Sequence, residues 1–325
     1  MSTNLTYCYL PNEIQMWPGL PLSLNGEEII PLDYRAGDSG WLLYGRSLNK
    51  QRISYFQKRS GDAIVIVSSW RIDDYQVVRI EGSFNTKIKK IAQECNLDIV
   101  KLGNIPRLRT PGLLVINMDS TAIQIECIDE IARLVGISKR VTEITAGAMQ
   151  RENDLSERLR ACVKLLGGTN IHILQNVLAH IPITLGLTSL VRKLQAFDWQ
   201  IVIISGRFNF FTNYLTEKLK LTTVVSNILE ILNNKFSGRV FSNILDAEVK
   251  AQTLIKLARQ FSIPIEQTIA IGDSDNDVKI ISQAGLGIAY HATEKVQAIA
   301  KVAIQHADLM GVLCVLSDDL KHEEH

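Results

Sequence analysis

Short apolar runs in the first hundred residues predict a small mixed module. Ala63–Val67 and Tyr75–Ile80 are rich in β-branched side chains, which strands favour. Ile88–Ala92 carries apolar side chains at helical spacing, and Asp98–Leu102 predicts another strand. This order of two strands, a helix and a strand indicates a small α+β domain.

A domain boundary is expected where prolines interrupt the chain, in the segment NIPRLRTPG with Pro106 and Pro111. Proline disfavours helix at its own position and at the preceding one. We therefore expect an N-terminal α+β domain at 1–107, with a regulatory or dimerisation role, and a second domain at 108–325.

The second domain has the pattern of a buried parallel sheet. Apolar strands are predicted at 113–116, 201–204 and 268–271, and helical patterns separate them. Continuous Val/Ile strands with helical crossovers are typical of an α/β fold whose sheet is covered on both faces. A mostly helical insertion at roughly 125–190 is expected to cap the carboxyl edge of the sheet.

Composition and charge exclude several classes of protein. The 325 residues are 46% hydrophobic and 21% charged, which is typical of globular domains, and the formal net charge is +1. No run of Lys and Arg suggests a nucleic-acid partner. The five cysteines form no CxxC pair, which argues against a disulfide framework and against zinc.

Cellular location is also suggested by the sequence. The segment MSTNLTYCYLPNEI lacks the basic and apolar regions of a signal peptide, and no apolar run approaches the roughly 18 residues that span a bilayer. We therefore expect a cytoplasmic protein with no membrane partner.

Polar segments follow the predicted strands, where open α/β sheets bind their ligands. They are Asn117–Thr121, Ser205–Phe208 and Gly272–Asp277, with Lys250 between the last two. Because the carboxyl ends of parallel strands meet at one edge, we expect these segments to form one site.

In this order the segments resemble the four motifs of the haloacid dehalogenase superfamily. The stretches NMDSTAIQIECIDEIA, ILDAEVKAQTL, AIGDSDND and AGLGIAYHA resemble bacterial phosphoserine phosphatases, including longer forms with an N-terminal module. The resemblance implies a Rossmannoid parallel sheet with a helical cap inserted after the first motif. It also implies hydrolysis of phosphoserine in serine biosynthesis.

The same resemblance implies roles for individual residues. Asn117 stands at the nucleophile position and Asp119 at that of the acid/base. Contacts to substrate are implied for Glu126, Cys162, Ser205, Gly206, Lys250 and Asn276. A Mg²⁺ site is implied for Asn117, Asp119, Asp273 and Asp277, since Mg²⁺ prefers oxygen ligands.

Several positions depart from the family pattern. An amide at Asn117 is a very poor nucleophile and removes a negative charge from the expected metal site. Cys162 replaces the arginine that grips the substrate carboxylate, and Arg160, two residues away, should point elsewhere on a helix. Leu155 replaces a phenylalanine, and Arg207 replaces a glycine of the second motif.

Alternative functions follow from these departures. One is a Mg²⁺-dependent phosphoserine phosphatase whose hydrolysis is weak or absent. Another is a non-catalytic protein that binds Mg²⁺ and phosphoserine or regulates a partner, and another is a folded product that has lost its role. In the first two, the expected ligand is a small phosphomonoester, and a homodimer is the expected assembly.

Overall fold

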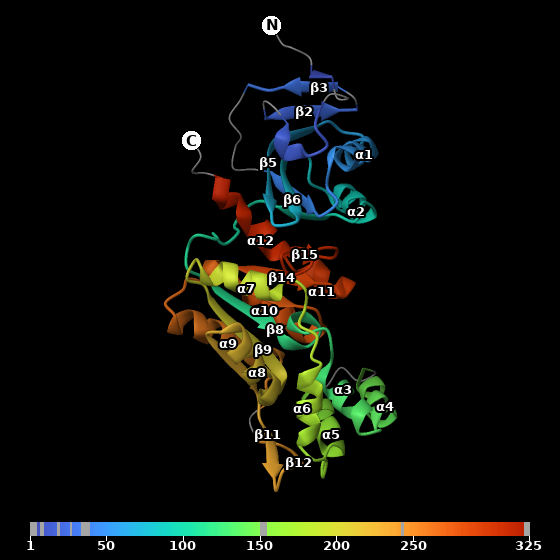
Figure 1. The fold of residues 1–325 in the computed structure, drawn as a ribbon, viewed down its shortest axis with the longest axis vertical. Helices are drawn as coiled ribbons and strands as arrows, with labels where there is room; N and C mark the ends of the chain where they lie inside the picture. Colours follow the sequence, from blue (N-terminus) through green and yellow to red (C-terminus); the bar gives the residue numbers. More distant parts are fainter. Residues whose placement is uncertain are drawn as a thin grey trace. The chain divides into compact units, whose positions relative to one another are not determined.

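The computed structural model describes residues 5–6, 10–17, 20–26, 28–33, 40–149, 155–241 and 244–321. Figure 1 shows the chain from blue at the N-terminus to red at the C-terminus. Packing divides the chain into two compact units. Residues 1–109 and 302–325 form one unit, and residues 110–301 form the other.

The N-terminal unit is built on an antiparallel sheet with strand order β1-β3-β2-β5-β6-β4-β7. The elements from residues 1–109 are β1 (Leu5–Thr6), η2 (Ile14–Met16), β2 (Leu22–Asn25), β3 (Glu28–Pro31), β4 (Trp41–Gly45), α1 (Lys50–Ser60), β5 (Ile64–Ile72), β6 (Tyr75–Glu81), α2 (Thr86–Glu94) and β7 (Asp98–Lys101). The C-terminal segment adds β15 (Val302–Ile304), α12 (Gly311–Leu316) and η6 (Ser317–Lys321).

The predicted elements of this unit are confirmed as β5, β6, α2 and β7, but helix α1 was not predicted. Its sequence, KQRISYFQKRS, has too few apolar residues for a clear helical pattern. Two of them, Ile53 and Phe56, are buried against the sheet. The side chain of Asn49 accepts the backbone N–H of Arg52 and so caps the first turn.

The C-terminal segment is anchored within this unit by one carboxylate. Asp98, only 4% exposed, accepts backbone N–H groups from Gln305 at 2.8 Å, His306 at 3.1 Å and Ala307 at 2.7 Å. Burial raises the pKa of Asp98, and these hydrogen bonds oppose the rise. Asp98 and Gln305 are 207 positions apart, so this contact leaves no local pattern in the sequence.

Replacing Asp98 by alanine should lower the free energy of unfolding of this unit by about 2–3 kcal/mol, because buried backbone donors lose their acceptor. Urea denaturation would measure the loss, and amide hydrogen exchange should accelerate at residues 305–307. Asp62→Ala, which removes an exposed carboxylate of the same unit, is the matched control. Equal stability and equal exchange in both variants would contradict the anchoring role.

The second unit contains the parallel sheet, with strands in the order β10-β9-β8-β13-β14. The predicted α/β fold is confirmed. The elements up to α8 are β8 (Leu113–Asn117), η3 (Met118–Ala122), α3 (Cys127–Leu134), α4 (Ser138–Met149), α5 (Leu155–Leu165), α6 (His172–Ala179), α7 (Leu187–Gln195), β9 (Gln200–Phe208) and α8 (Asn209–Leu219). The later elements are β10 (Thr223–Asn227), β11 (Leu229–Leu232), β12 (Lys235–Val240), α9 (Ala247–Gln260), η4 (Ile265–Gln267), β13 (Thr268–Gly272), η5 (Asp275–Asp277), α10 (Val278–Gln283), β14 (Leu286–Tyr290) and α11 (Glu294–Ile299).

The sheet of this unit is apolar on both faces, as the continuous Val/Ile strands predicted. Leu113 and Val115 of β8 belong to a core cluster with Leu254 of α9 and Ile280 of α10. The intervening side chains, represented by Leu114, are also fully buried. Helices on both faces therefore leave the carboxyl ends of the strands as the place where polar side chains gather.

Helices α3 to α6 form the cap, which Figure 1 shows grouped apart from the sheet. The two stems of this insertion meet where Ile123 pairs with Ile183. Helix α7 lies beyond the stem, packs against β9 and has a buried apolar face that includes Leu190. The expected range of 125–190 thus extends into a helix that belongs to the sheet layer, because a buried apolar face looks alike in both settings.

Candidate functional site

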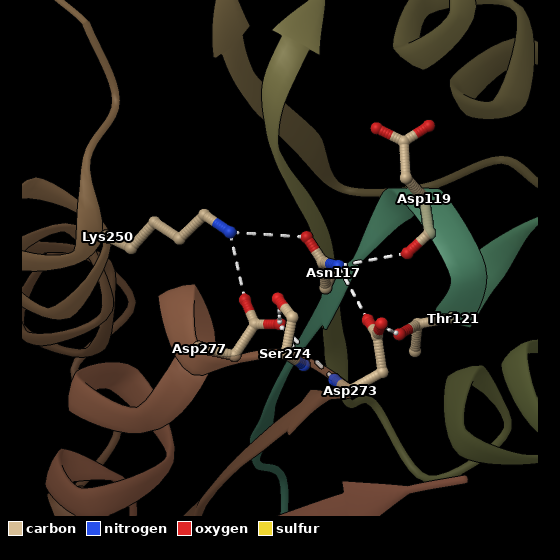
Figure 2. A network of polar contacts seen from close by, with 7 residues as sticks. All are labelled: Asn117, Asp119, Thr121, Lys250, Asp273, Ser274 and Asp277. Atoms are coloured by element: carbon tan, nitrogen blue, oxygen red, sulfur yellow. Dashed lines mark hydrogen bonds and ion pairs between the residues drawn. The ribbon is translucent and has the colours of Figure 1, made fainter. Parts of the chain in front are cut away.

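The candidate site lies where the central strands end, at the carboxyl ends of β8 and β13. Figure 2 shows that Asn117, Thr121 and Asp273 converge there and that Lys250 reaches in from α9. Asn117 is the last residue of β8, and Asp273 follows directly after β13. The tertiary structure therefore brings together residues that are far apart in the sequence.

The amide of Asn117 has partners on both of its polar atoms. Its Nδ2 donates to the backbone carbonyl of Asp119 at 3.0 Å and to Oδ1 of Asp273 at 3.1 Å. Its Oδ1 accepts from Nζ of Lys250 at 3.3 Å. The amide links the first motif, the lysine and the last motif.

Asp273 has a strongly perturbed carboxyl group. Burial raises its pKa to about 6, and repulsion from Asp277 adds to the rise. Hydrogen bonds from Thr121, at 2.9 Å, and from Asn117 favour the carboxylate and oppose the rise. Burial and the neighbouring carboxylate thus outweigh the two hydrogen bonds in setting this pKa.

Lys250 and Asp277 form a buried ion pair at 2.9 Å, with side chains 2% and 1% exposed. The other carboxylate oxygen of Asp277 accepts the N–H of Asp273 at 3.2 Å and the Ser274 hydroxyl at 3.1 Å. A Cβ on Gly272 would lie 2.4 Å from the Cβ of Asp277, so this position admits only glycine. Asp277 therefore holds both the lysine and the loop after β13.

Asp119 faces away from this network, and Figure 2 shows its carboxylate pointing away from Asn117. The carboxylate is 6% exposed and accepts the backbone N–H of Cys127 at 3.1 Å. This N–H belongs to the first residue of α3, where a helix end favours negative charge. The side chain is held toward the cap, while its backbone carbonyl is held toward Asn117.

A pocket joins the strand ends to the cap. Much of its lining was predicted from the sequence, and the described residues that form it are Asn117, Asp119, Glu126, Arg158, Leu159, Gly206, Ile244, Leu245, Asp246, Lys250, Ser274 and Asn276. Glu126 accepts a hydrogen bond from the Ser120 hydroxyl at 2.9 Å. The Oδ1 atom of Asn276 is buried without a hydrogen-bond partner among the described residues.

Some predicted residues do not line this pocket. Cys162 is 1% exposed and packed within α5, and Ser205 is 1% exposed on β9. Asp277 lies instead at a smaller neighbouring cavity that also contacts Asn117 and Lys250. Only the backbone is described for Leu155 and Arg207, so the predictions for their side chains lie outside the described part of the chain.

Sequence reasoning missed Arg158, the arginine of α5 that reaches the pocket. It lies four residues before Cys162, and residues four apart share one face of a helix. Arg160 is exposed, as its helical position predicted. The signal in the sequence is this four-residue spacing, which places Arg158 on the same face of the helix as the position where the family has its arginine.

Asn227 was also missed, because it ends strand β10 in a segment that carries no motif. It is 1% exposed, its Nδ2 donates to the carbonyl of Gly206 at 2.7 Å, and its Oδ1 accepts the N–H of Leu245 at 2.9 Å. Gly206 and Leu245 both line the pocket. Asn227 therefore positions two walls of the pocket without lining it.

The polar side chains at the strand ends do not form the donor set of a divalent metal ion. Within the described ranges, no group of three or more His, Cys, Asp or Glu side chains is arranged to hold one. Asn117 presents an NH₂ group, not an oxygen, to Asp119 and Asp273. In this arrangement the residues do not fit a divalent cation. In the same ranges, no helix has the length and apolar character needed to cross a bilayer.

Comparisons with known families cover both units. A model of haloacid dehalogenase-like hydrolases matches residues 226–316, and a model of a domain of unknown function matches residues 37–101. The phosphoserine phosphatase of Vibrio cholerae serotype O1 is 39% identical over 279 residues, which cover 86% of this chain and 85% of that protein. The phosphoserine phosphatase of Haemophilus influenzae is 38% identical over 303 residues, or 93% and 95% of the two chains.

Solved structures show the same similarity. A probable phosphoserine phosphatase from Vibrio cholerae, in unliganded form, matches with a TM-score of 0.81 and 39% identity over 86% of each chain. A substrate-bound phosphoserine phosphatase complex matches with a TM-score of 0.59 and 32% identity, over 63% of this chain and 97% of that one. The similarity extends over both units in the first case.

Proposed function

This chain belongs to the phosphoserine phosphatase family of haloacid dehalogenase-like hydrolases, and from that premise we propose that it binds an O-phosphorylated amino acid of the phosphoserine type. The binding site is the pocket between the strand ends and the cap. We further propose that hydrolysis of this ligand is weak or absent.

One observation carries the binding proposal: the same pocket is lined by Lys250, Arg158 and Glu126. Phosphoserine carries a phosphate, a carboxylate and an ammonium group. Lys250 supplies positive charge for the phosphate at the strand end, with Ser205 and Gly206 on the adjoining strand. Arg158 is suited to the carboxylate, because guanidinium and carboxylate pair in bidentate geometry, and Glu126 is suited to the ammonium group.

Weak hydrolysis follows from the chemistry of Asn117. An amide nitrogen has no available lone pair, and the amide oxygen already accepts from Lys250. The covalent route through an aspartyl phosphate is therefore closed, and phosphate monoesters are among the slowest substrates to hydrolyse without catalysis. Remaining turnover needs direct attack of water, with Asp119 as the group that can accept its proton.

The resemblance to phosphoserine phosphatases implies a divalent metal, and Mg²⁺ is the ion expected from the sequence. The arrangement at the strand ends disfavours this ion, because the NH₂ group of Asn117 faces the oxygens that would have to bind it. A serine-releasing reaction would belong to serine biosynthesis. The cysteines in the described ranges, Cys95, Cys127, Cys162 and Cys314, are free buried thiols, which accords with a cytoplasmic setting. A homodimer stays a prediction.

Calorimetric titration with O-phospho-L-serine tests the proposal. The wild-type chain should bind it, and Arg158→Ala should weaken binding by about 10- to 100-fold, the effect of one charge-assisted hydrogen-bonding partner. Affinity for inorganic phosphate, which has no carboxylate, should change little.

Arg160→Ala is the matched control, since it removes an exposed guanidinium from the same helix. It should leave both affinities unchanged. The proposal fails if the wild-type chain does not bind phosphoserine at millimolar concentration, or if Arg158→Ala and Arg160→Ala behave alike.

A further inference from the structure

The Nδ2 atom of Asn117 lies between two acceptor oxygens. Two such oxygens repel each other unless a hydrogen-bond donor or a cation lies between them. The backbone carbonyl of Asp119 and Oδ1 of Asp273 are 3.0 and 3.1 Å from this nitrogen. A carboxylate at position 117 would place acceptors alone around this point, since an ionised carboxylate donates no hydrogen. Such a cluster requires a cation, whereas the amide supplies two N–H donors of its own.

Lys250 determines which way the amide faces. Its ammonium group donates only, and it lies 3.3 Å from Oδ1 of Asn117. Rotating the amide by half a turn would set NH₂ against the ammonium group and oxygen against the oxygens of Asp119 and Asp273. Both contacts would be repulsive, so the NH₂ group stays directed at the two acceptors.

The carboxylates of Asp273 and Asp277 also have protein partners without a metal. Asp277 is paired with Lys250 at 2.9 Å. Asp273 accepts from both Thr121 and Asn117. Mg²⁺ demands nearly octahedral oxygen coordination and loses its water reluctantly. A neutral amide whose N–H donors face the oxygens of Asp119 and Asp273 therefore contributes little to Mg²⁺ binding.

We infer that the Asn117 amide takes the place of the divalent cation in this chain. The strand-end site is assembled without metal, and the hydrogen bonds of the amide hold Asp119 and Asp273 together.

Thermal unfolding of the full chain in EDTA and in MgCl₂ of matched ionic strength tests the inference. The melting temperature of the wild-type chain should be the same in both. Asn117→Asp should melt lower in EDTA, and Mg²⁺ at about ten times its dissociation constant should raise its melting temperature by roughly 3 °C or more. Asn213→Asp, which adds the same charge at an exposed site on α8, should not respond to Mg²⁺.

A Mn²⁺ titration of the wild-type chain, followed by electron paramagnetic resonance, needs no variant to fold. Submillimolar binding that Asp273→Asn abolishes would overturn the inference, as would a folded Asn117→Asp that gains no response to Mg²⁺. Absence of such binding supports it. Neither measurement uses a phosphate ligand, so the result is separate from that of the phosphoserine titration.

Discussion

Replacing Lys250 by methionine should lower the free energy of unfolding by about 3–5 kcal/mol, the usual effect of leaving one charge of a buried ion pair without its partner. Asp277 would be that charge, since its side chain is 1% exposed and Lys250 lies 2.9 Å away. Chemical denaturation followed by circular dichroism would measure the loss. Phosphate binding should be lost in the same variant, because the positive charge at the strand end is removed.

Two further variants separate the ion pair from general effects of substitution in α9. Lys256→Met changes an exposed lysine of the same helix and should be nearly neutral. Asp277→Asn combined with Lys250→Met removes both charges, so the double variant should be less destabilised than the sum of the two single variants. A loss below about 1 kcal/mol for Lys250→Met, the range of exposed pairs, would show that the buried pair does not anchor the site.

Asn117→Asp should raise the rate of phosphate release from phosphoserine in Mg²⁺ by at least roughly 1,000-fold, because removing a catalytic nucleophile typically costs more than this. Asp119 already lines the pocket as the acid/base candidate, and Arg158 and Glu126 line the substrate side. The structure therefore predicts that one substitution is enough. A colorimetric phosphate assay on purified protein measures the gain.

Asn117→Ala is the control for this experiment and should stay at the wild-type level. Adding Asp119→Asn to Asn117→Asp should remove the gain, since the proton carrier is lost. Mass spectrometry of the peptide that contains Asn117 should accompany every assay, because slow deamidation would create the aspartate in the wild-type chain. A folded Asn117→Asp with the wild-type rate would show that more than the nucleophile is missing.

The position of Cys162 bears on whether Asn117→Asp is enough to give hydrolysis. The resemblance to phosphoserine phosphatases implies an arginine at this position that grips the substrate carboxylate. The thiol is 1% exposed within α5, so a guanidinium there would have to be buried. Arg158, one turn earlier, already reaches the pocket. Alignment of motifs identifies a lost residue but cannot reveal that another residue on the same helical face reaches the same pocket.

The N-terminal unit shows a different limit of sequence reasoning. Its strands β5, β6 and β7 and helix α2 carry clear local patterns and were predicted. Helix α1 was missed, because its stability comes from packing of Ile53 and Phe56 more than from its own composition. Burial against a sheet that forms elsewhere in the chain is invisible to a local pattern.

The sequence by itself determined the parallel sheet, its helical cap and the order of polar segments at the strand ends. These features depend on local periodicity and on motifs, which are written along the chain. Only the tertiary structure decided that the NH₂ group of Asn117 faces Asp119 and Asp273, that Arg158 lines the pocket, and that Asp98 anchors the C-terminal segment. Each of these features depends on contacts between residues far apart in the sequence. The packing of the whole unit determines which of these residues come into contact.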